Sequence, residues 1–170
     1  MRILIAEDET IVRLDLRGVL ERAGHEVCEA RDGSEAVVLA GEWRPDLAIL
    51  DVKMPILDGI EAARRITAAT PLPVVLLTAY ADEATVARAV GAGVFGYLVK
   101  PFRESEIAPV LETAWARHMD WLSTRRELGK RLVPPAETVD VVVEGTHRYP
   151  LRIARRPDGQ VDVTLVDGRE

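Results

Sequence analysis

The chain has 170 residues, of which 48% are hydrophobic, and a formal net charge of −6. This composition excludes the intrinsically disordered class, and the negative charge argues against a nucleic-acid-binding surface spread over the whole chain. Cys28 is the only cysteine, which excludes an intrachain disulfide, and no run approaches the roughly 20 apolar residues of a membrane span. We therefore expect a cytoplasmic protein without membrane contact.

The first hundred residues alternate between short apolar runs and amphipathic stretches, separated by Gly, Pro and Asp. The apolar runs predict strands at 2–6, 25–30, 45–51, 74–78 and 94–99. The amphipathic stretches predict helices at 10–23, 32–40, 60–69 and 82–91. In the first helix, Ile11, Leu14, Val19 and Leu20 recur at helical spacing.

Five strand–helix repeats with short connections indicate an α/β fold, because right-handed crossovers place helices on both faces of a parallel sheet. The fully apolar strands agree with this fold, because the central strands of such sheets are buried on both sides. We predict a flavodoxin-like, doubly wound, five-stranded parallel sheet of order 2-1-3-4-5, in which the first and third strands are neighbours.

The remaining residues follow a different pattern. A long helix is predicted over 103–132, ended by Pro134 and Pro135. Alternating residues at 139–143, 149–153 and 161–166 predict a small antiparallel β meander. We expect a main domain at 1–116, a helical extension or linker at 117–135, and a small three-stranded β region at 136–170.

Residues with phosphoryl or metal chemistry follow four of the predicted strands. They are Glu7 and Asp8, Asp51, Thr78, and Lys100. In a parallel α/β sheet these side chains gather at the carboxyl edge, where such sheets bind ligands. Any one of them has an ordinary structural role available, since Asp51 and Thr78 also suit a turn or a helix cap. The combination favours a common site.

Asp51 is the candidate phosphoacceptor. A carboxylate is a weak nucleophile, so transfer of a phosphoryl group to it depends on positioning and on neutralising the phosphoryl oxygens. A hard divalent cation, Mg2+ (or Mn2+), suits carboxylate, carbonyl and water ligands. We expect Asp8 and Asp51 to be direct ligands, Glu7 to act through water, and the main-chain carbonyl of Lys53 to fill another position. Lys100 and Thr78 would hold phosphoryl oxygens.

Residues 1–116 resemble the receiver domain of two-component response regulators. The motifs are Glu7-Asp8, Asp51-Val52-Lys53-Met54-Pro55 with Asp58-Gly59, Thr78-Ala79, and Tyr97 with Lys100-Pro101-Phe102. The likeness is greatest to receivers of antitermination-type regulators, whose three-helix RNA-binding output module the tail here does not match.

The resemblance implies that Asp51 accepts phosphate from a phosphohistidine of a sensor histidine kinase or phosphotransfer protein. It implies a magnesium ion on Glu7, Asp8 and Asp51, phosphoryl contacts from Thr78, Ala79 and Lys100, and a cis bond before Pro101. It also implies a switch in which Thr78 moves toward the phosphoryl group and Tyr97 turns inward. The chain would then be a signalling protein and not an enzyme acting on other substrates.

Two further positions, Lys53 and Tyr80, are candidates for tuning dephosphorylation. A bulky Tyr80 would hinder the attacking water and lengthen the phosphorylated lifetime. A Tyr80→Ala variant would then lose phosphate faster than the parent.

Three questions of output stay open at this stage. The long helix invites self-association as a homodimer, although His118 and Arg125 are poor seam residues for a coiled coil. An arginine cluster in the tail would suit nucleic-acid contact, but nearby aspartates dilute it; its members are Arg148, Arg152, Arg155 and Arg156. An aspartate-based phosphatase of similar topology would need a second acid at position 53, where this chain has lysine.

Overall fold

The computed structural model describes residues 1–79, 88–89, 92–132, 138–144, 148–155 and 161–165, with side chains as far as Arg126. The chain divides into two compact units, Met1–Ala116 and Arg117–Glu170. In the described residues, no helix combines the length and apolar character that a membrane crossing requires.

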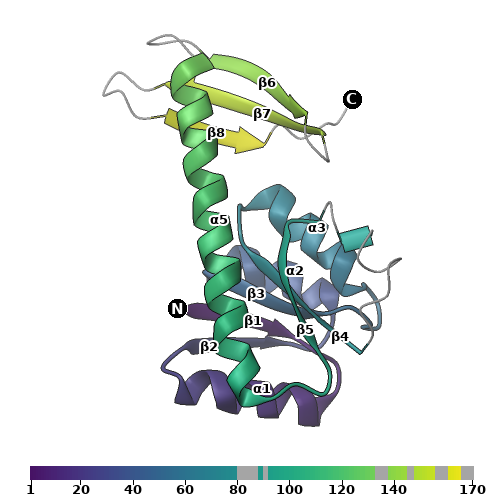
Figure 1. The fold of residues 1–170 in the computed structure, drawn as a ribbon. Helices are drawn as coiled ribbons and strands as arrows, with labels where there is room; N and C mark the ends of the chain where they lie inside the picture. The colour runs from purple at the N-terminus through teal and green to yellow at the C-terminus, as the bar shows by residue number, and fades with distance from the viewer. Residues whose placement is uncertain (80–87, 90–91, 133–137, 145–147, 156–160, 166–170) are drawn as a thin grey trace. The chain divides into compact units, whose positions relative to one another are not determined.

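The first unit is built on a five-stranded parallel sheet of order β2-β1-β3-β4-β5 (Figure 1). Its strands are β1 (Arg2–Ala6), β2 (Glu26–Ala30), β3 (Leu47–Asp51), β4 (Val74–Thr78) and β5 (Val94–Val99). Its helices are α1 (Thr10–Arg22), α2 (Gly33–Trp43), α3 (Gly59–Ala69) and the first turns of α5 (Glu104–Leu132). The predicted fold class is confirmed, while most of the helix predicted at 82–91 lies outside the described residues.

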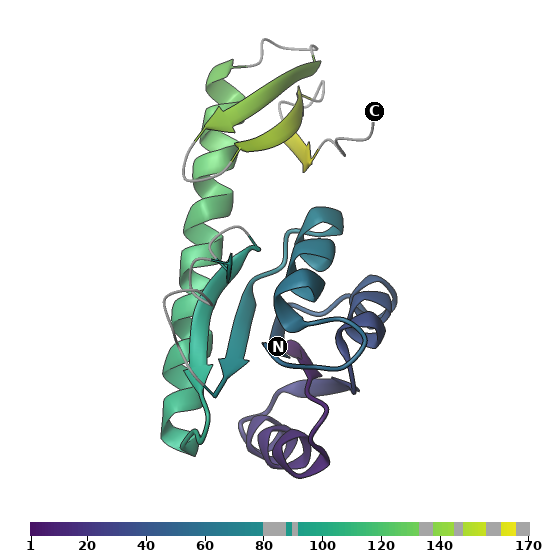
Figure 2. The same cartoon turned by 90° about the vertical axis from the view of Figure 1, so that its right-hand side faces the viewer.

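Helices lie on both faces of the sheet (Figure 2). Strand alternation divides the core into two clusters, one on each face. On one face, Leu4, Leu50 and Leu76 pack beneath α2 and α3. On the other face, odd-numbered neighbours such as Ile5 and Ile49 pack beneath α1 and α5. β3 and β4 are buried from end to end and β1 is buried from Ile3 to Ala6, so the strands that lead to the carboxyl edge are packed on both faces.

The buried face of α1 differs from the one its apolar residues suggest. Ile11 and Leu14 are 84% and 55% exposed, whereas Arg13 is only 8% exposed and lies in the same row as Leu16. Arg13 points toward the end of β1, where its guanidinium donates to the main-chain carbonyl of Glu7. Apolar spacing alone therefore located the helix correctly but not its full buried face.

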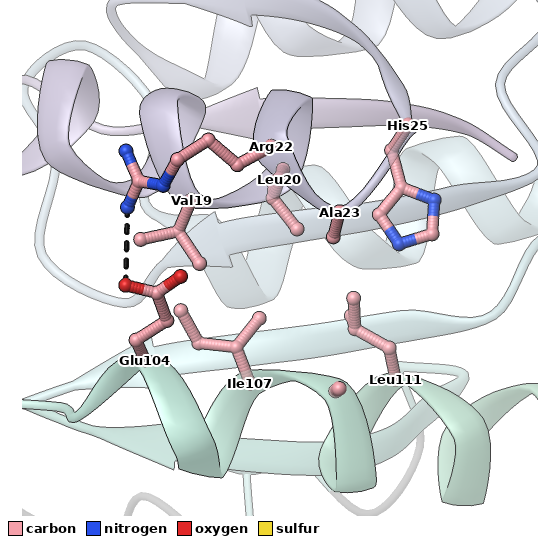
Figure 3. A pocket seen from close by; sticks show the side chains of 9 residues that line it. Val19, Leu20, Arg22, Ala23, His25, Glu104, Ile107 and Leu111 are labelled. Carbon is pink, nitrogen blue, oxygen red and sulfur yellow. Dashed lines mark hydrogen bonds and ion pairs between the residues drawn. The ribbon is translucent and has the colours of Figure 1, made fainter.

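A small apolar cavity of about 210 Å3 separates α1 from α5 (Figure 3). Val19, Leu20, Ile107 and Leu111 line it, and Arg22 closes one side through an ion pair to Glu104 at 3.1 Å. No residue of the predicted phosphoryl or metal set lines this cavity, so it is distinct from the candidate site.

The start of α3 lies unusually close to the end of β3. The Asp58 side chain caps α3 by accepting from the Glu61 N–H at 2.8 Å, and the Gly59 N–H donates to the Val52 carbonyl at 3.2 Å. A Cβ atom added at Gly59 would overlap the main-chain carbonyl oxygen of Asp51. Glycine at this position lets the helix approach the strand that carries Asp51.

Gly59→Ala is expected to destabilise the protein by about 2 kcal/mol, because the backbone of β3 must shift to admit the methyl group. Gly41 is a matched control, since a Cβ there meets nothing within 4 Å and the residue lies within α2. Gly41→Ala should stabilise by roughly 0.5–1 kcal/mol through helix propensity. Urea unfolding measures both, and equal effects of the two substitutions would contradict the close approach at Gly59.

The second unit contains the end of α5 and a three-stranded antiparallel sheet of order β6-β7-β8. Its strands are β6 (Thr138–Glu144), β7 (Arg148–Arg155) and β8 (Val161–Leu165), so the predicted meander is present. The register places Arg152 opposite Asp140, and Arg148 opposite Glu144. Arg156, the remaining member of the arginine cluster beside Arg155, lies outside the described residues.

Candidate functional site

The sheet topology brings the predicted site residues to one edge. β1 lies between β2 and β3, and Ala6 is in register with Leu50, so Glu7 and Asp51 follow neighbouring strands at the same level. Thr78 ends β4 in register with Val99, and the Lys100 N–H donates to the Thr78 carbonyl at 2.8 Å. The four strand ends therefore converge, as the predicted strand order requires.

Three carboxylates form the centre of this edge. Glu7, Asp8 and Asp51 each offer an oxygen, and these oxygens lie within 4.8 Å of one another. Glu7 is fully buried and Asp51 is 5% exposed, whereas Asp8 is exposed. Asp8 is the member of this group that is exposed to solvent.

Lys100 provides the positive charge at this cluster. Its Nζ lies 2.5 Å from Glu7 Oε2 and 3.3 Å from Asp51 Oδ1, and its side chain is 16% exposed. The Glu9 N–H donates to the other Glu7 oxygen, Oε1, at 3.0 Å. Buried carboxylates need such partners, because an unpaired buried charge is costly.

The electrostatics of the cluster are set by burial. Burial raises the pKa of Glu7 above its ordinary value of 4.5, although the hydrogen bond from Lys100 opposes this. Burial likewise raises the pKa of Asp51 above 3.8, against the opposing charge of Lys100 and with a further increase from Asp8. The pKa of Lys100 is raised: burial lowers it, but the hydrogen bond that Lys100 donates to Glu7 and the charge of Asp51 outweigh that effect. A cation in addition to Lys100 would stabilise the ionised forms of Glu7 and Asp51.

The donor set fits a hard divalent cation. Three carboxylates against one ammonium leave two negative charges in excess when all are ionised, which a divalent ion would balance. The ligand atoms are all oxygens, the type that Mg2+ and Mn2+ prefer. Asp8 is exposed at the mouth of the cluster, where a partly hydrated ion enters most easily.

The remaining predicted residues lie around the cluster in different environments. Thr78 is buried, Ala79 and Lys53 are exposed, and Tyr97 is half-buried against the core beneath α2 and α3. The bond between Lys100 and Pro101 is cis. Tyr80 lies outside the described residues, so its proposed effect on dephosphorylation stays a prediction.

Two arginines at this edge, Arg88 and Arg13, were not among the residues predicted from the sequence. Arg88 donates to Asp58 Oδ2 at 2.7 Å, which ties it to the cap of α3. Arg13 donates to the main-chain carbonyl of Glu7 at 2.6 Å. The available signal for Arg13 was its place three residues before Leu16, on the face of α1 that packs against the sheet.

Comparison with known proteins assigns the family. Residues 3–112 match the family model of the response regulator receiver domain. The chain is 50% identical over 117 residues to the transcriptional regulatory protein PdtaR of Mycobacterium tuberculosis, a match that covers 68% of this chain and 57% of that protein. It is 35% identical over 112 residues to the chemotaxis protein CheY of Thermotoga maritima, with 65% of this chain and 93% of CheY covered.

The solved structures agree with the sequence relatives. The signal receiver domain of a modulated diguanylate cyclase from Desulfovibrio desulfuricans superposes with a TM-score of 0.64 at 35% identity, covering 69% of this chain and 95% of that one. The chain belongs to the response regulator receiver family and carries a receiver domain of two-component signal transduction. The match spans little more than half the length of PdtaR.

Proposed function

We propose that this protein is a phosphorylation switch in which Asp51 accepts a phosphoryl group from a phosphohistidine. An Asp51 carboxylate oxygen attacks phosphorus, the P–O bond forms as the P–N bond breaks, and the released imidazole takes up a proton. The observation that supports this most directly is the buried Asp51 carboxylate, 3.3 Å from Lys100 and grouped with Glu7 and Asp8. Within this scheme we expect no turnover of other substrates.

Each residue has a defined task in this step. Lys100 already contacts Asp51 Oδ1 and stays charged, so it is placed to neutralise a phosphoryl oxygen as the bond forms. Thr78 would offer its hydroxyl and Ala79 its main-chain N–H to the other oxygens. Glu7, Asp8, Asp51 and the Lys53 carbonyl would hold Mg2+, which supplies Lewis-acid neutralisation of the phosphoryl charge when bound.

A small phosphodonor such as acetyl phosphate tests the proposal without the partner kinase. With Mg2+ present, we expect the intact mass of the protein to rise by one phosphoryl group. Addition of EDTA should prevent the increase in mass, because removal of Mg2+ leaves the negative charge of the three carboxylates without a divalent cation to balance it. An unchanged mass in the presence of Mg2+ would overturn the proposed function.

Cation affinity should depend on pH in a defined direction. Because the pKa values of Glu7 and Asp51 lie above the ordinary 4.5 and 3.8, protons compete for these oxygens at a higher pH than in exposed carboxylates. We expect the apparent Kd for Mg2+ to increase as pH falls from neutral toward 4.5. Calorimetric titration at several pH values measures this Kd. A Kd that does not change over that pH range would contradict the raised pKa values.

The raised pKa values of Glu7 and Asp51 also predict how the stability of the metal-free protein depends on pH. A folded-state pKa above the unfolded value contributes stability that is complete below the unfolded pKa and is lost as pH rises through the folded pKa. Glu7 and Asp51 should therefore favour the folded state near their ordinary pKa values, 4.5 and 3.8, and cease to do so as they ionise.

The partner would be a sensor kinase or phosphotransfer protein in the cytoplasm. Exposed apolar side chains lie within a few residues of the acidic cluster: Ile11 is 84% exposed and Leu14 is 55% exposed on α1, and Ile56 is 83% exposed in the loop after β3. Ile56 also has a positive φ of 68°, which is rare for a β-branched residue. These side chains would form an apolar rim against which a phosphohistidine-bearing partner docks.

The output would be a change of protein contacts, including dimerisation. We propose residues 1–116 as the receiver, 117–135 as a helical extension and 136–170 as the contact region. Movement of Thr78 toward the phosphoryl group would let the half-buried Tyr97 turn inward, shifting an existing two-state equilibrium. Size measurement with and without beryllofluoride and Mg2+ tests this, and a molecular mass unaffected by both would remove dimerisation from the proposal.

A further inference from the structure

A buried guanidinium lies directly beneath the acidic cluster. Arg13, in the first turn of α1, is 8% exposed, and its Nη1 donates to the main-chain carbonyls of Glu7 at 2.6 Å and Asp8 at 3.3 Å. Its contacts are with the peptide groups of these residues and leave their carboxylate oxygens free for other partners. Arg13 therefore holds the segment without competing for its ligand atoms.

A second carboxylate holds the guanidinium in place. Arg13 Nε donates to Glu29 Oε1 at 3.3 Å, and Arg17 Nη1 donates to Glu29 Oε2 at 2.6 Å. Arg17 also donates to Glu21 Oε1 at 2.8 Å. Both oxygens of Glu29 thus accept hydrogen bonds. Arg13 is therefore held by the Glu29 carboxylate as well as by the two main-chain carbonyls.

The segment that Arg13 contacts has no regular secondary structure of its own. Glu7, Asp8 and Glu9 lie between β1 and α1, outside both elements. The Glu7 N–H donates to the Ala30 carbonyl of β2 at 3.2 Å, and the Glu7 carbonyl accepts from Arg13. The main chain of Glu7 is thereby anchored on both sides, by β2 and by α1.

We propose that Arg13 is a positioning residue for the cation site, acting through the main chain of Glu7 and Asp8. This inference rests on the proposed function, in which these two residues hold the ion. Mg2+ requires near-ideal octahedral geometry, so small displacements of the ligand-bearing backbone weaken its binding. Partners that orient metal ligands typically contribute 10-fold to 100-fold in affinity.

Removal of the Arg13 guanidinium should change cation binding in opposite directions, depending on whether its charge or its positioning of the main chain matters more. Loss of a positive charge beside an acidic cluster should strengthen cation binding, if charge alone decides. Loss of the two carbonyl contacts should weaken binding, if position decides. The sign of the change therefore separates the two explanations.

The test uses Mn2+ binding to the full chain, measured by electron paramagnetic resonance of free Mn2+ without any phosphodonor. We expect Arg13→Gln to weaken binding by about tenfold. Arg13→Lys, which keeps the charge but lacks the fork of donors, should give a smaller loss. Arg17→Gln is the matched control, because Arg17 contacts the same Glu29 but neither carbonyl, and it should bind within about twofold of the parent.

Circular dichroism of the metal-free variants shows whether each is folded. If Arg13→Gln is unfolded, Arg13→Lys is the variant used to test the proposal. Parent-like or tighter binding by a folded Arg13 variant would overturn the positioning role while leaving the phosphorylation proposal intact. Failure of the parent itself to bind Mn2+ would overturn both.

Discussion

Asp51→Asn is expected to abolish phosphoryl incorporation and to stabilise the metal-free protein. The amide has no nucleophilic carboxylate oxygen, so the mass increase with a phosphodonor and Mg2+ should be lost completely. Stability should rise near neutral pH because Asp51 is ionised there in a buried site beside Asp8 that raises its pKa. Intact mass and urea unfolding measure the two effects.

Asp15→Asn is the matched control for this prediction, since Asp15 is exposed on α1. It should leave both phosphorylation and stability close to those of the parent. Continued phosphorylation of Asp51→Asn would mean that another residue accepts the group. A loss of metal-free stability in Asp51→Asn would mean that the buried carboxylate is better compensated than its pKa indicates.

Lys100→Met is expected to cause a large loss of stability in the absence of a metal. The substitution removes the ammonium that lies 2.5 Å from the fully buried Glu7 and leaves Asp51 without its nearest positive charge. Breaking a buried ion pair in this way typically costs about 3 kcal/mol or more. Urea unfolding in EDTA at neutral pH measures the loss.

Mg2+ should reduce this stability gap, because a bound cation would compensate the same carboxylates. Phosphorylation should remain impaired, since the charge placed at the phosphoryl oxygen is gone. Arg117→Met, at an exposed arginine of α5, is the control and should change stability by no more than about 0.5 kcal/mol. A Lys100→Met variant as stable as the parent in EDTA would contradict the ion-pair account.

The strands that carry the site could be predicted because each is a short apolar run that ends in, or is closely followed by, a polar residue. β3 and β4, for example, are buried from end to end and finish at Asp51 and Thr78. Once the order 2-1-3-4-5 is inferred, the meeting of Asp8 with Asp51 follows from the adjacency of β1 and β3. The acidic cluster was accessible to sequence reasoning for that reason.

Arg13 could not be predicted in the same way, because its role depends on partners outside its own helix. Helical spacing alone favoured Ile11 and Leu14, whose side chains the structure leaves exposed. Arg13 is buried instead, and its burial is possible because Glu29 and two main-chain carbonyls accept its donors. Those partners come from β2 and from the loop after β1, which local sequence patterns do not connect.

The most direct test of the central claim is the location of the phosphoryl group. Borohydride reduces an aspartyl phosphate to homoserine, which marks the acceptor in a peptide mass map. After treatment with acetyl phosphate and Mg2+, we predict homoserine at position 51 and at no other aspartate. Homoserine at a different aspartate, or unmodified Asp51 in a protein that has gained phosphate, would contradict the account.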